Sequence, residues 1–214
     1  MPESATVCGL PTALSVIVSV AVLEPSVCGL KATFIAQLVR GARVPPEYST
    51  GVFHLHVTRQ YNEALPEARR GLELSPDAPL LHDLLSGIYA QTQQPRLAAE
   101  EALKAEESWG ASQERTAALR HAYEASGAEG LWRKRVELNK KVAGHQYLNA
   151  FDIANDYALL GDRSETLDWL ERAYRVRDLR FPYVRFIPCF DSVRSDPRFQ
   201  DLVRGMNFPQ PETK

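Results

Sequence analysis

The chain has 214 residues, a formal net charge of −2 and a hydrophobic fraction of 44%, which fits one globular domain or a short repeat array. A charge this close to neutral argues against a general nucleic-acid binder, which needs a clear basic excess. The three cysteines, Cys8, Cys28 and Cys189, form no CxxC pair, so neither a disulfide scaffold nor a zinc site is predicted. A bridge between Cys8 and Cys28 would require export of the N-terminus.

The first 44 residues do not match the rest of the chain. Residues 5–23 carry no charge and contain an apolar run that is nearly as long as the roughly 20 residues needed to span a bilayer. If this run spans, Lys31, Arg40 and Arg43 would hold the remainder on the cytoplasmic side of the inner membrane. No positive charge precedes the run, as a secretory signal would require. A membrane segment and a poorly packed leader both stay open.

The segment that follows has the spacing of a helix. Phe34, Ile35, Leu38 and Val39 fall on one face of a helix over residues 34–43. The Pro45-Pro46 pair stops any helix and marks the boundary between the leader and the remainder of the chain.

A period of 34 residues organises the chain beyond this boundary. Tyr89, Tyr123 and Tyr157 recur at that interval, and Ala64 and Ala98 do the same. Such a period, with small residues at fixed positions, is the signature of stacked helical hairpins. The predicted units are 45–78, 79–112, 113–146 and 147–180.

Each unit is predicted to contain two helices and a turn. The first unit has helices over 47–58 and 62–74, and the second over 80–91 and 97–107, with small side chains that let the paired helices approach closely. Gly127 and Gly161 mark the turns of the third and fourth units.

The last segment, 181–214, is predicted to cap the array. Ser195 or Asp196 can cap a helix that starts at Pro197. An apolar stripe follows and would cover the open edge of the last hairpin. The stripe consists of Phe199, Leu202, Val203 and Met206.

The tyrosine column, the alanine column and the turn glycines resemble tetratricopeptide repeats. The stretches 156–162, 168–174 and 190–199 are similar to the C-terminal repeat region of bacterial multidomain regulators that carry a Ser/Thr kinase, winged-helix or adenylate-cyclase domain. The resemblance covers about 48–208 and implies an all-α, right-handed superhelix of antiparallel hairpins, an α-solenoid. No kinase, winged-helix or cyclase motif occurs in this chain, so a regulatory or sensor region separated from its effector is one interpretation.

Motifs for catalysis are absent from the sequence. There is no glycine-rich phosphate loop, no nucleophile elbow and no HExxH, so no catalytic, cofactor-binding or metal-binding residue is predicted. His54 and His56 are two positions apart and would point in different directions on a helix. Cys189 is interpreted as a small hydrophobe in an extended Pro-Cys-Phe segment.

Charged side chains are interpreted mainly as solvated helix faces. Glutamates of the second unit, Glu100, Glu101, Glu106 and Glu107, are placed on its outer face. The basic cluster of Arg133, Lys134, Arg135, Lys140 and Lys141 has Glu129 and Glu137 interleaved. A solvated face and an anion-binding surface both stay open for this cluster.

The resemblance implies that the first helix of each unit lines a concave groove for a peptide. The expected function is therefore a non-catalytic interaction or scaffolding module in a bacterial cytoplasm; a membrane-tethered assembly factor is a further alternative. The groove is mixed, acidic in the middle and apolar toward its end, which favours a basic or amphipathic segment as partner. Its lining positions are Leu80, Asp83, Gly87, Ala90, Glu114, Ala117, His121, Glu124, Leu148, Phe151, Asn155 and Leu159.

Overall fold

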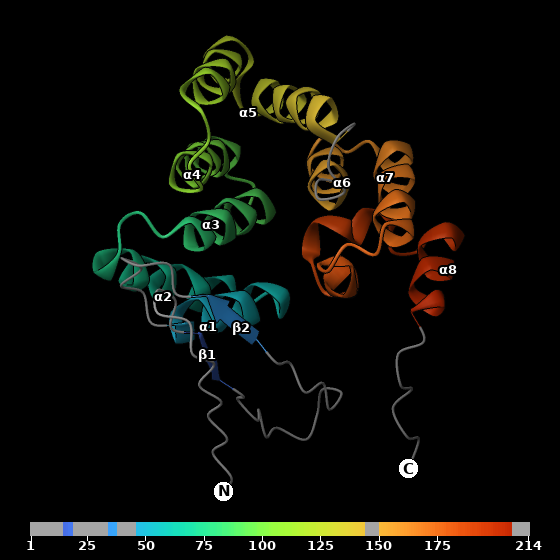
Figure 1. Cartoon of the computed structure of the whole chain (residues 1–214), viewed down its shortest axis with the longest axis horizontal. Coiled ribbons are helices and arrows are strands. Elements are labelled where there is room, and N and C mark those ends of the chain that lie inside the picture. The colour runs from blue at the N-terminus through green and yellow to red at the C-terminus, as the bar shows by residue number, and fades with distance from the viewer. Residues whose placement is uncertain (1–14, 19–33, 38–45, 144–149, 207–214) are drawn as a thin grey trace, which may run out of the picture.

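The computed structural model describes residues 15–18, 34–37, 46–143 and 150–206 of the chain. From residue 46 onward these residues form helices joined by short turns (Figure 1). The elements are α1 Pro46–Val57, α2 Tyr61–Leu74, α3 Pro79–Gln91, α4 Pro95–Ser108, α5 Gln113–Ala143, α6 Ala150–Leu159, α7 Arg163–Arg175, the 3₁₀ helices η1 Phe181–Arg185 and η2 Pro188–Val193, and α8 Pro197–Gly205.

The predicted helical hairpins are present. Helices α1 and α2 pack together, as do α3 and α4, and α6 and α7. The third unit is drawn as the single long helix α5, but Ser126 and Gly127 have non-helical backbone angles and divide it into two halves. The predicted stop at Gly127 is thus a sharp kink within α5. Two helices per unit are therefore confirmed for the first, second and fourth units.

The 34-residue period also appears in the backbone conformation of the turns. The four residues Arg59, Gln93, Gly127 and Gly161 lie 34 apart, and all have positive φ, at 62°, 59°, 63° and 75°. After the first, second and fourth of these, the next N–H bonds back five residues: Gln60 to Leu55, Gln94 to Tyr89 and Asp162 to Tyr157. A left-handed residue followed by this bond is the Schellman end of a helix. Three hairpins therefore turn by one mechanism.

The kink in α5 needs glycine for a different reason. A Cβ built on Gly130 would lie 2.4 Å from the carbonyl oxygen of Ala122 and 2.7 Å from the Cβ of Ser126. No side chain fits in that space, so Gly130 lets the second half of α5 start directly against the end of the first.

Two apolar clusters form the core. The first spans α1 to α5 and is built around the fully buried Val52, Leu81, Ile88, Leu119 and Leu131. The small residues predicted at helix contacts are buried there, and a Cβ on Gly71 would lie 2.5 Å from Leu81 Cδ1. The second cluster joins α6 and α7 to the C-terminal segment. Its fully buried members are Ala154, Leu170, Ala173, Phe190 and Val193.

The tyrosine column is only partly a packing feature. Tyr89 is buried and Tyr123 packs partly buried against the first cluster. Tyr157 is half-buried, and its hydroxyl lies 2.5 Å from the Lys140 ammonium group.

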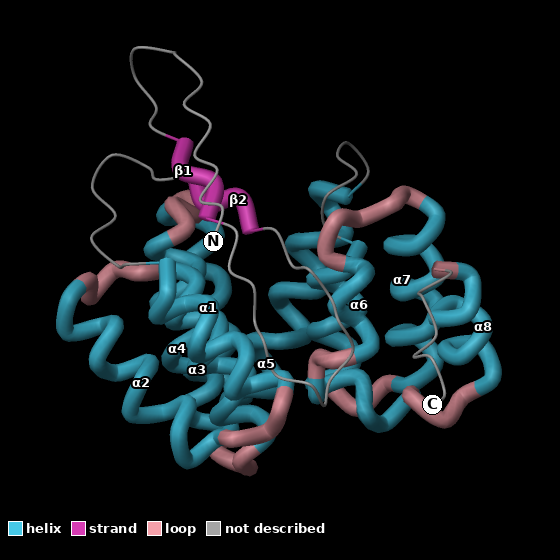
Figure 2. The backbone as a smooth tube through the Cα atoms, turned by 90° about the horizontal axis from the view of Figure 1, so that it is seen from below, coloured by secondary structure: helices cyan, strands magenta, loops and turns pink. Residues whose placement is uncertain are grey.

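The helix expected near the end of the chain is present as α8. Asp196 accepts a hydrogen bond from the Arg198 N–H at 2.9 Å, and Pro197 starts α8. Phe199 is buried in the second cluster, with Leu202, Val203 and Met206 packed beside it. Figure 2 shows α6, α7 and α8 side by side. The extended conformation expected around Cys189 was wrong, because Pro188–Val193 forms the 3₁₀ helix η2.

The two ends of the described array meet. The helices follow one another around an arch in Figure 1, and the η1–η2 segment returns to α1 and α3 across its opening. Phe53 of α1 packs edge-on against Tyr183 of η1, with ring centroids 5.4 Å apart. Beside it, Arg59 forms an ion pair with Asp191 of η2 at 2.7 Å. The arch is therefore closed into a ring.

Near the N-terminus the structure departs from the predicted helix. Residues Phe34–Gln37 form strand β2, which pairs antiparallel with strand β1, Ser15–Val18, with Val16 opposite Ala36. Both segments are rich in β-branched or aromatic residues, which suit a strand, and this preference outweighs the helical spacing. The rest of the 1–44 leader, including most of the proposed 5–23 membrane run, lies outside the described residues. Among the described helices, none is long and apolar enough to cross a membrane.

Candidate functional site

A cavity of about 600 Å³ lies at the centre of the ring. It is bounded by α1, α3, the end of α4, both halves of α5, α6 and the η1–η2 segment. Its lining residues are His56, Asp83, Leu84, Ser86, Gly87, Gln91, Glu106, Trp109, Arg115, Arg135, Asn139, Phe151, Asp152, Asn155, Leu159, Arg180, Ile187 and Cys189.

Five of the predicted groove positions line this cavity: Asp83 and Gly87 on α3, and Phe151, Asn155 and Leu159 on α6. The first helix of the second and fourth units thus faces inward, as expected.

The other groove positions lie elsewhere. Leu80, in the first turn of α3, is 46% exposed and does not line the cavity. The four predicted groove positions on α5 also lie outside the cavity lining. Ala90 of α3 packs against the first apolar cluster instead. These α5 positions are Glu114, Ala117, His121 and Glu124; Leu148 lies outside the described residues.

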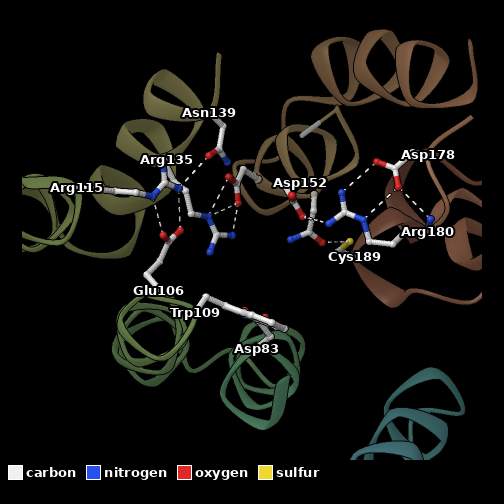
Figure 3. Close-up of polar contacts among 12 residues, drawn as sticks. Asp83, Glu106, Trp109, Arg115, Arg135, Asn139, Asp152, Asp178, Arg180 and Cys189 are labelled. Carbon is white, nitrogen blue, oxygen red and sulfur yellow. Dashed lines mark hydrogen bonds and ion pairs between the residues drawn. The ribbon is translucent and has the colours of Figure 1, made fainter. Parts of the chain in front are cut away.

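In the third unit, the inward side chains come from positions that the period did not select. Arg115 lies in the first half of α5, whereas Arg135 and Asn139 lie in the second half. The Arg115 guanidinium donates to both carboxylate oxygens of Glu106, at 2.7 and 2.9 Å, and to Asn139 Oδ1 at 2.9 Å (Figure 3). Glu106 is therefore part of the cavity wall, and its predicted place on a solvated outer face was wrong.

Arg135 forms the deepest ion pair of the wall. Its Nε donates to Asp156 Oδ1 and Oδ2 at 2.8 and 3.0 Å, and the Asp156 side chain is fully buried. Burial alone would lower the pKa of Arg135, but the Asp156 carboxylate outweighs it and raises that pKa. Arg135 also lies over the Trp132 ring, 4.7 Å from its centroid. The pair is a fixed, charged part of the wall.

Arg180 lies on the opposite side of the cavity, where it follows α7. Its guanidinium contacts Asp152 at 2.5 Å and Asp178 at 3.0 Å (Figure 3). It also lies over the Phe151 ring at 5.4 Å, and Phe151 itself packs edge-on against Phe190. Through these contacts α6 and the C-terminal segment share one charged wall.

Asp83 and Trp109 form a part of the wall in which the carboxylate is bound by an indole and not by an arginine. The Trp109 Nε1–H donates to Asp83 Oδ2 at 2.7 Å, and the Trp109 side chain remains 63% exposed. The Asp83 side chain is itself exposed, and partial desolvation by the walls around it, more than any other influence, raises its pKa, with Asp152 and Glu106 adding to the effect. Asp83 makes no ion pair with a basic side chain within the described residues.

Two further groups at the cavity are uncharged. Burial and, less strongly, Arg59 lower the pKa of His56 to about 4, so its imidazole is neutral near pH 7. His56 Nδ1 is fully enclosed and makes no hydrogen bond in the described part of the chain. Cys189 donates its thiol to Asn155 Oδ1 at 2.9 Å, and burial raises the pKa of that thiol.

Three members of the basic cluster of α5 pair with the interleaved glutamates, whereas Lys140 contacts Tyr157 and Glu165 of the next hairpin. Arg133 pairs with Glu129 at 2.7 Å, and Glu137 holds both Lys134 and Lys141, at 2.8 and 2.7 Å. The structure therefore favours the solvated interpretation over an anion-binding surface. Arg135, one position further along the same cluster, points inward, and no signal in the basic run distinguishes it.

Metal binding is not indicated by the described residues, among which no three His, Cys, Asp or Glu side chains are placed to share an ion. Comparisons of the chain with protein-family models, with curated proteins and with solved structures found no match.

Proposed function

We propose that this protein is a non-catalytic interaction module that binds a short segment of a partner protein in its central cavity. The observation that carries the proposal is the meeting of five predicted groove residues with charged side chains of α4, α5 and the C-terminal segment around 600 Å³ of space. Cavities of roughly 300–1,000 Å³ hold ligands of small size. A few residues of a peptide fit such a volume, whereas a long extended peptide does not.

The chemistry of the wall supports binding over catalysis. A general acid or base must be able to exchange a proton with a substrate. Glu106, Asp152 and Asp156 are instead held by arginines, and the fourth carboxylate, Asp83, accepts a hydrogen bond from the Trp109 indole. The Cys189 thiol is kept protonated by burial and is a poor nucleophile in that form.

The repeat architecture is part of the same proposal. The Schellman turns at 34-residue intervals support a tetratricopeptide-type array related to the repeat regions of bacterial regulators. We place the function in the cytoplasm on this ground. The ring closure by η1 and η2 differs from an open array, and it confines the ligand to the centre of the concave face.

A selection from a displayed peptide library tests the proposal. The full chain is used as bait, and the enriched peptides are synthesised and titrated by calorimetry against the wild type and two variants. Gln91→Trp fills part of the cavity, because Gln91 lines it and its side chain makes no hydrogen bond to the part of the chain that the structure describes. Gln200→Trp introduces the same bulk at an exposed position of α8.

The enriched peptides should bind Gln91→Trp at least about tenfold more weakly, a loss of about 1.4 kcal/mol. Gln200→Trp should bind them like the wild type. A selection without enriched peptides, or peptides that bind both variants equally well, would reject the cavity as a peptide site.

A further inference from the structure

The cavity lining itself holds three arginines and three carboxylates, and two further carboxylates, Asp156 and Asp178, pair with the arginines from behind it. Its three lining arginines, Arg115, Arg135 and Arg180, are each engaged by one or two carboxylates. Beyond these pairs, the Asp83 carboxylate also faces the cavity, and the neutral His56 adds no compensating charge. Because like charges repel, an entering anion meets carboxylates around every arginine, whereas an entering cation meets a carboxylate that no base holds.

The Asp83 carboxylate is ready to accept a hydrogen bond. Its Oδ2 accepts from Trp109 Nε1 at 2.7 Å, and its Oδ1 makes no hydrogen bond among the described residues. The bond to Oδ2 also fixes the indole, which Figure 3 shows beside Asp83 on the cavity side of α3 and α4. An oriented, exposed indole next to a carboxylate offers both an aromatic face and an acceptor.

These two groups match a planar cation. A guanidinium stacks on an indole face and donates N–H bonds to a carboxylate at the same time, whereas an ammonium group is compact and strongly hydrated. A cation over a tryptophan ring gains about 0.5–2 kcal/mol, depending on how far it is desolvated. Arginine is therefore a better fit than lysine.

Donors on the other walls favour a cation that belongs to a peptide. Arg135 Nη1 and the Asn155 amide nitrogen make no hydrogen bond within the described part of the chain. Both residues line the cavity, where peptide carbonyl oxygens would accept from them. A free polyamine has no such acceptors.

We propose that Asp83 and Trp109 form a subsite that recognises an arginine side chain of the bound partner segment. The indole of Trp109 carries the guanidinium on its face, and Asp83 Oδ1 accepts an N–H from it. The inference rests on the proposed peptide-binding function and specifies which side chain the cavity selects.

The test uses the full chain and the blocked pentapeptide acetyl-Gly-Gly-Arg-Gly-Gly-amide. A second peptide carries citrulline, which has nearly the same shape as arginine but no charge, and a third carries lysine. Binding is measured by calorimetry and by the change in tryptophan fluorescence. Charged hydrogen bonds contribute about 1.5–3 kcal/mol, so the citrulline peptide should bind about 10–100-fold more weakly.

Two asparagine variants separate the subsite from general charge. Asp83→Asn keeps an acceptor for Trp109 Nε1 but removes the negative charge, and it should weaken the arginine peptide about 10–100-fold. Asp77→Asn makes the same change at an exposed site before α3 and should alter the affinity less than about twofold. Circular dichroism reports whether both variants are folded, and the citrulline comparison on the wild type needs no variant.

Equal binding of the arginine and citrulline peptides, an unchanged affinity in a folded Asp83→Asn, or no binding of the arginine peptide would overturn the subsite. Spermidine binding as tightly as the peptide would overturn the peptide as the source of the cation. Library peptides that depend on Gln91 but tolerate Asp83→Asn would overturn only the subsite. A library without enriched peptides would instead reject the function on which the subsite rests.

Discussion

Two buried histidines, His82 and His56, lie in different surroundings. One is at the contact between helices α3 and α4, and the other is at the central cavity. Only 5% and 6% of their surfaces are exposed. His82 Nδ1 lies 2.6 Å from Glu101 and Nε2 lies 2.8 Å from the Pro76 carbonyl oxygen. The His56 imidazole makes no hydrogen bond within the described residues.

We interpret this difference as one between a structural region and the proposed binding region. An enclosed polar atom without a hydrogen-bond partner lowers stability by about 1–3 kcal/mol. The hydrogen bonds of His82 avoid this loss at the contact between α3 and α4. Among the described residues the cavity instead retains the enclosed His56 Nδ1 without a partner. The cavity wall still holds strong ion pairs, and these maintain its shape.

The largest expected effect is a loss of stability when the ion pair between Arg135 and Asp156 is broken. Asp156→Ala would leave Arg135 charged and unpaired, with 14% of its side chain exposed, and breaking a buried pair in this way costs about 3–5 kcal/mol. Urea unfolding followed by circular dichroism measures the loss. Asp201→Ala removes a carboxylate from an exposed pair with Arg204 and should cost about 0–1 kcal/mol. Similar losses in the two variants would contradict a buried pair that holds the wall.

A smaller effect is expected from pH, with opposite signs in the two regions. The pKa of His56 is about 4 in the folded chain and 6.5 in the reference state, so its contribution is complete above pH 6.5 and lost as the pH falls to 4. The Glu101 hydrogen bond raises the pKa of His82, so that contribution is present below pH 6.5 and lost as the pH rises through the raised value.

Unfolding free energies of the wild type and His56→Phe between pH 4 and 7 measure the first contribution, which amounts to about 3 kcal/mol at most. The wild type should lose more stability than the variant as the pH falls. Parallel pH profiles would show that His56 is not kept neutral by the fold.

The same substitution at both histidines gives the smallest but sharpest contrast. His82→Phe removes one of the two partners of Glu101, which is 12% exposed and keeps Lys104, and should cost about 1–3 kcal/mol at pH 6. His56→Phe removes no hydrogen bond and should change stability by less than about 1 kcal/mol at pH 7. Thermal unfolding measures both, and equal losses would contradict the contrast between the α3–α4 contact and the cavity.

Much of the helical layout could be predicted from the sequence, because each hairpin repeats local rules. The 34-residue period, the buried alanines of α2 and α4 and the Pro197 start of α8 all depend on residues close together in the chain. Strand β2 was missed, because four residues with helical spacing also suit a strand, and the pairing with β1 decides between them.

The cavity was only half predictable, for a physical reason. Asp83 and Asn155 follow from the resemblance, but Arg135 lies beyond the kink of α5 at Ser126 and Gly127, and Glu106 comes from α4, the second helix of its unit. Arg135 meets Asp156 across 21 positions of the chain, and Arg59 meets Asp191 across 132. No periodic pattern encodes such meetings, because they depend on the curvature that the whole array accumulates.

The contact of η1 and η2 with α1 also sets how the array can unfold and evolve. In an open repeat array each unit touches only its neighbours, so the ends can fray while the middle stays folded. Here Phe53–Tyr183 and Arg59–Asp191 tie the first hairpin to the η1–η2 segment, so detachment of either one breaks contacts with the other. An inserted repeat would be expected to separate these pairs and open the cavity. We therefore expect α1 and the η1–η2 segment to unfold together.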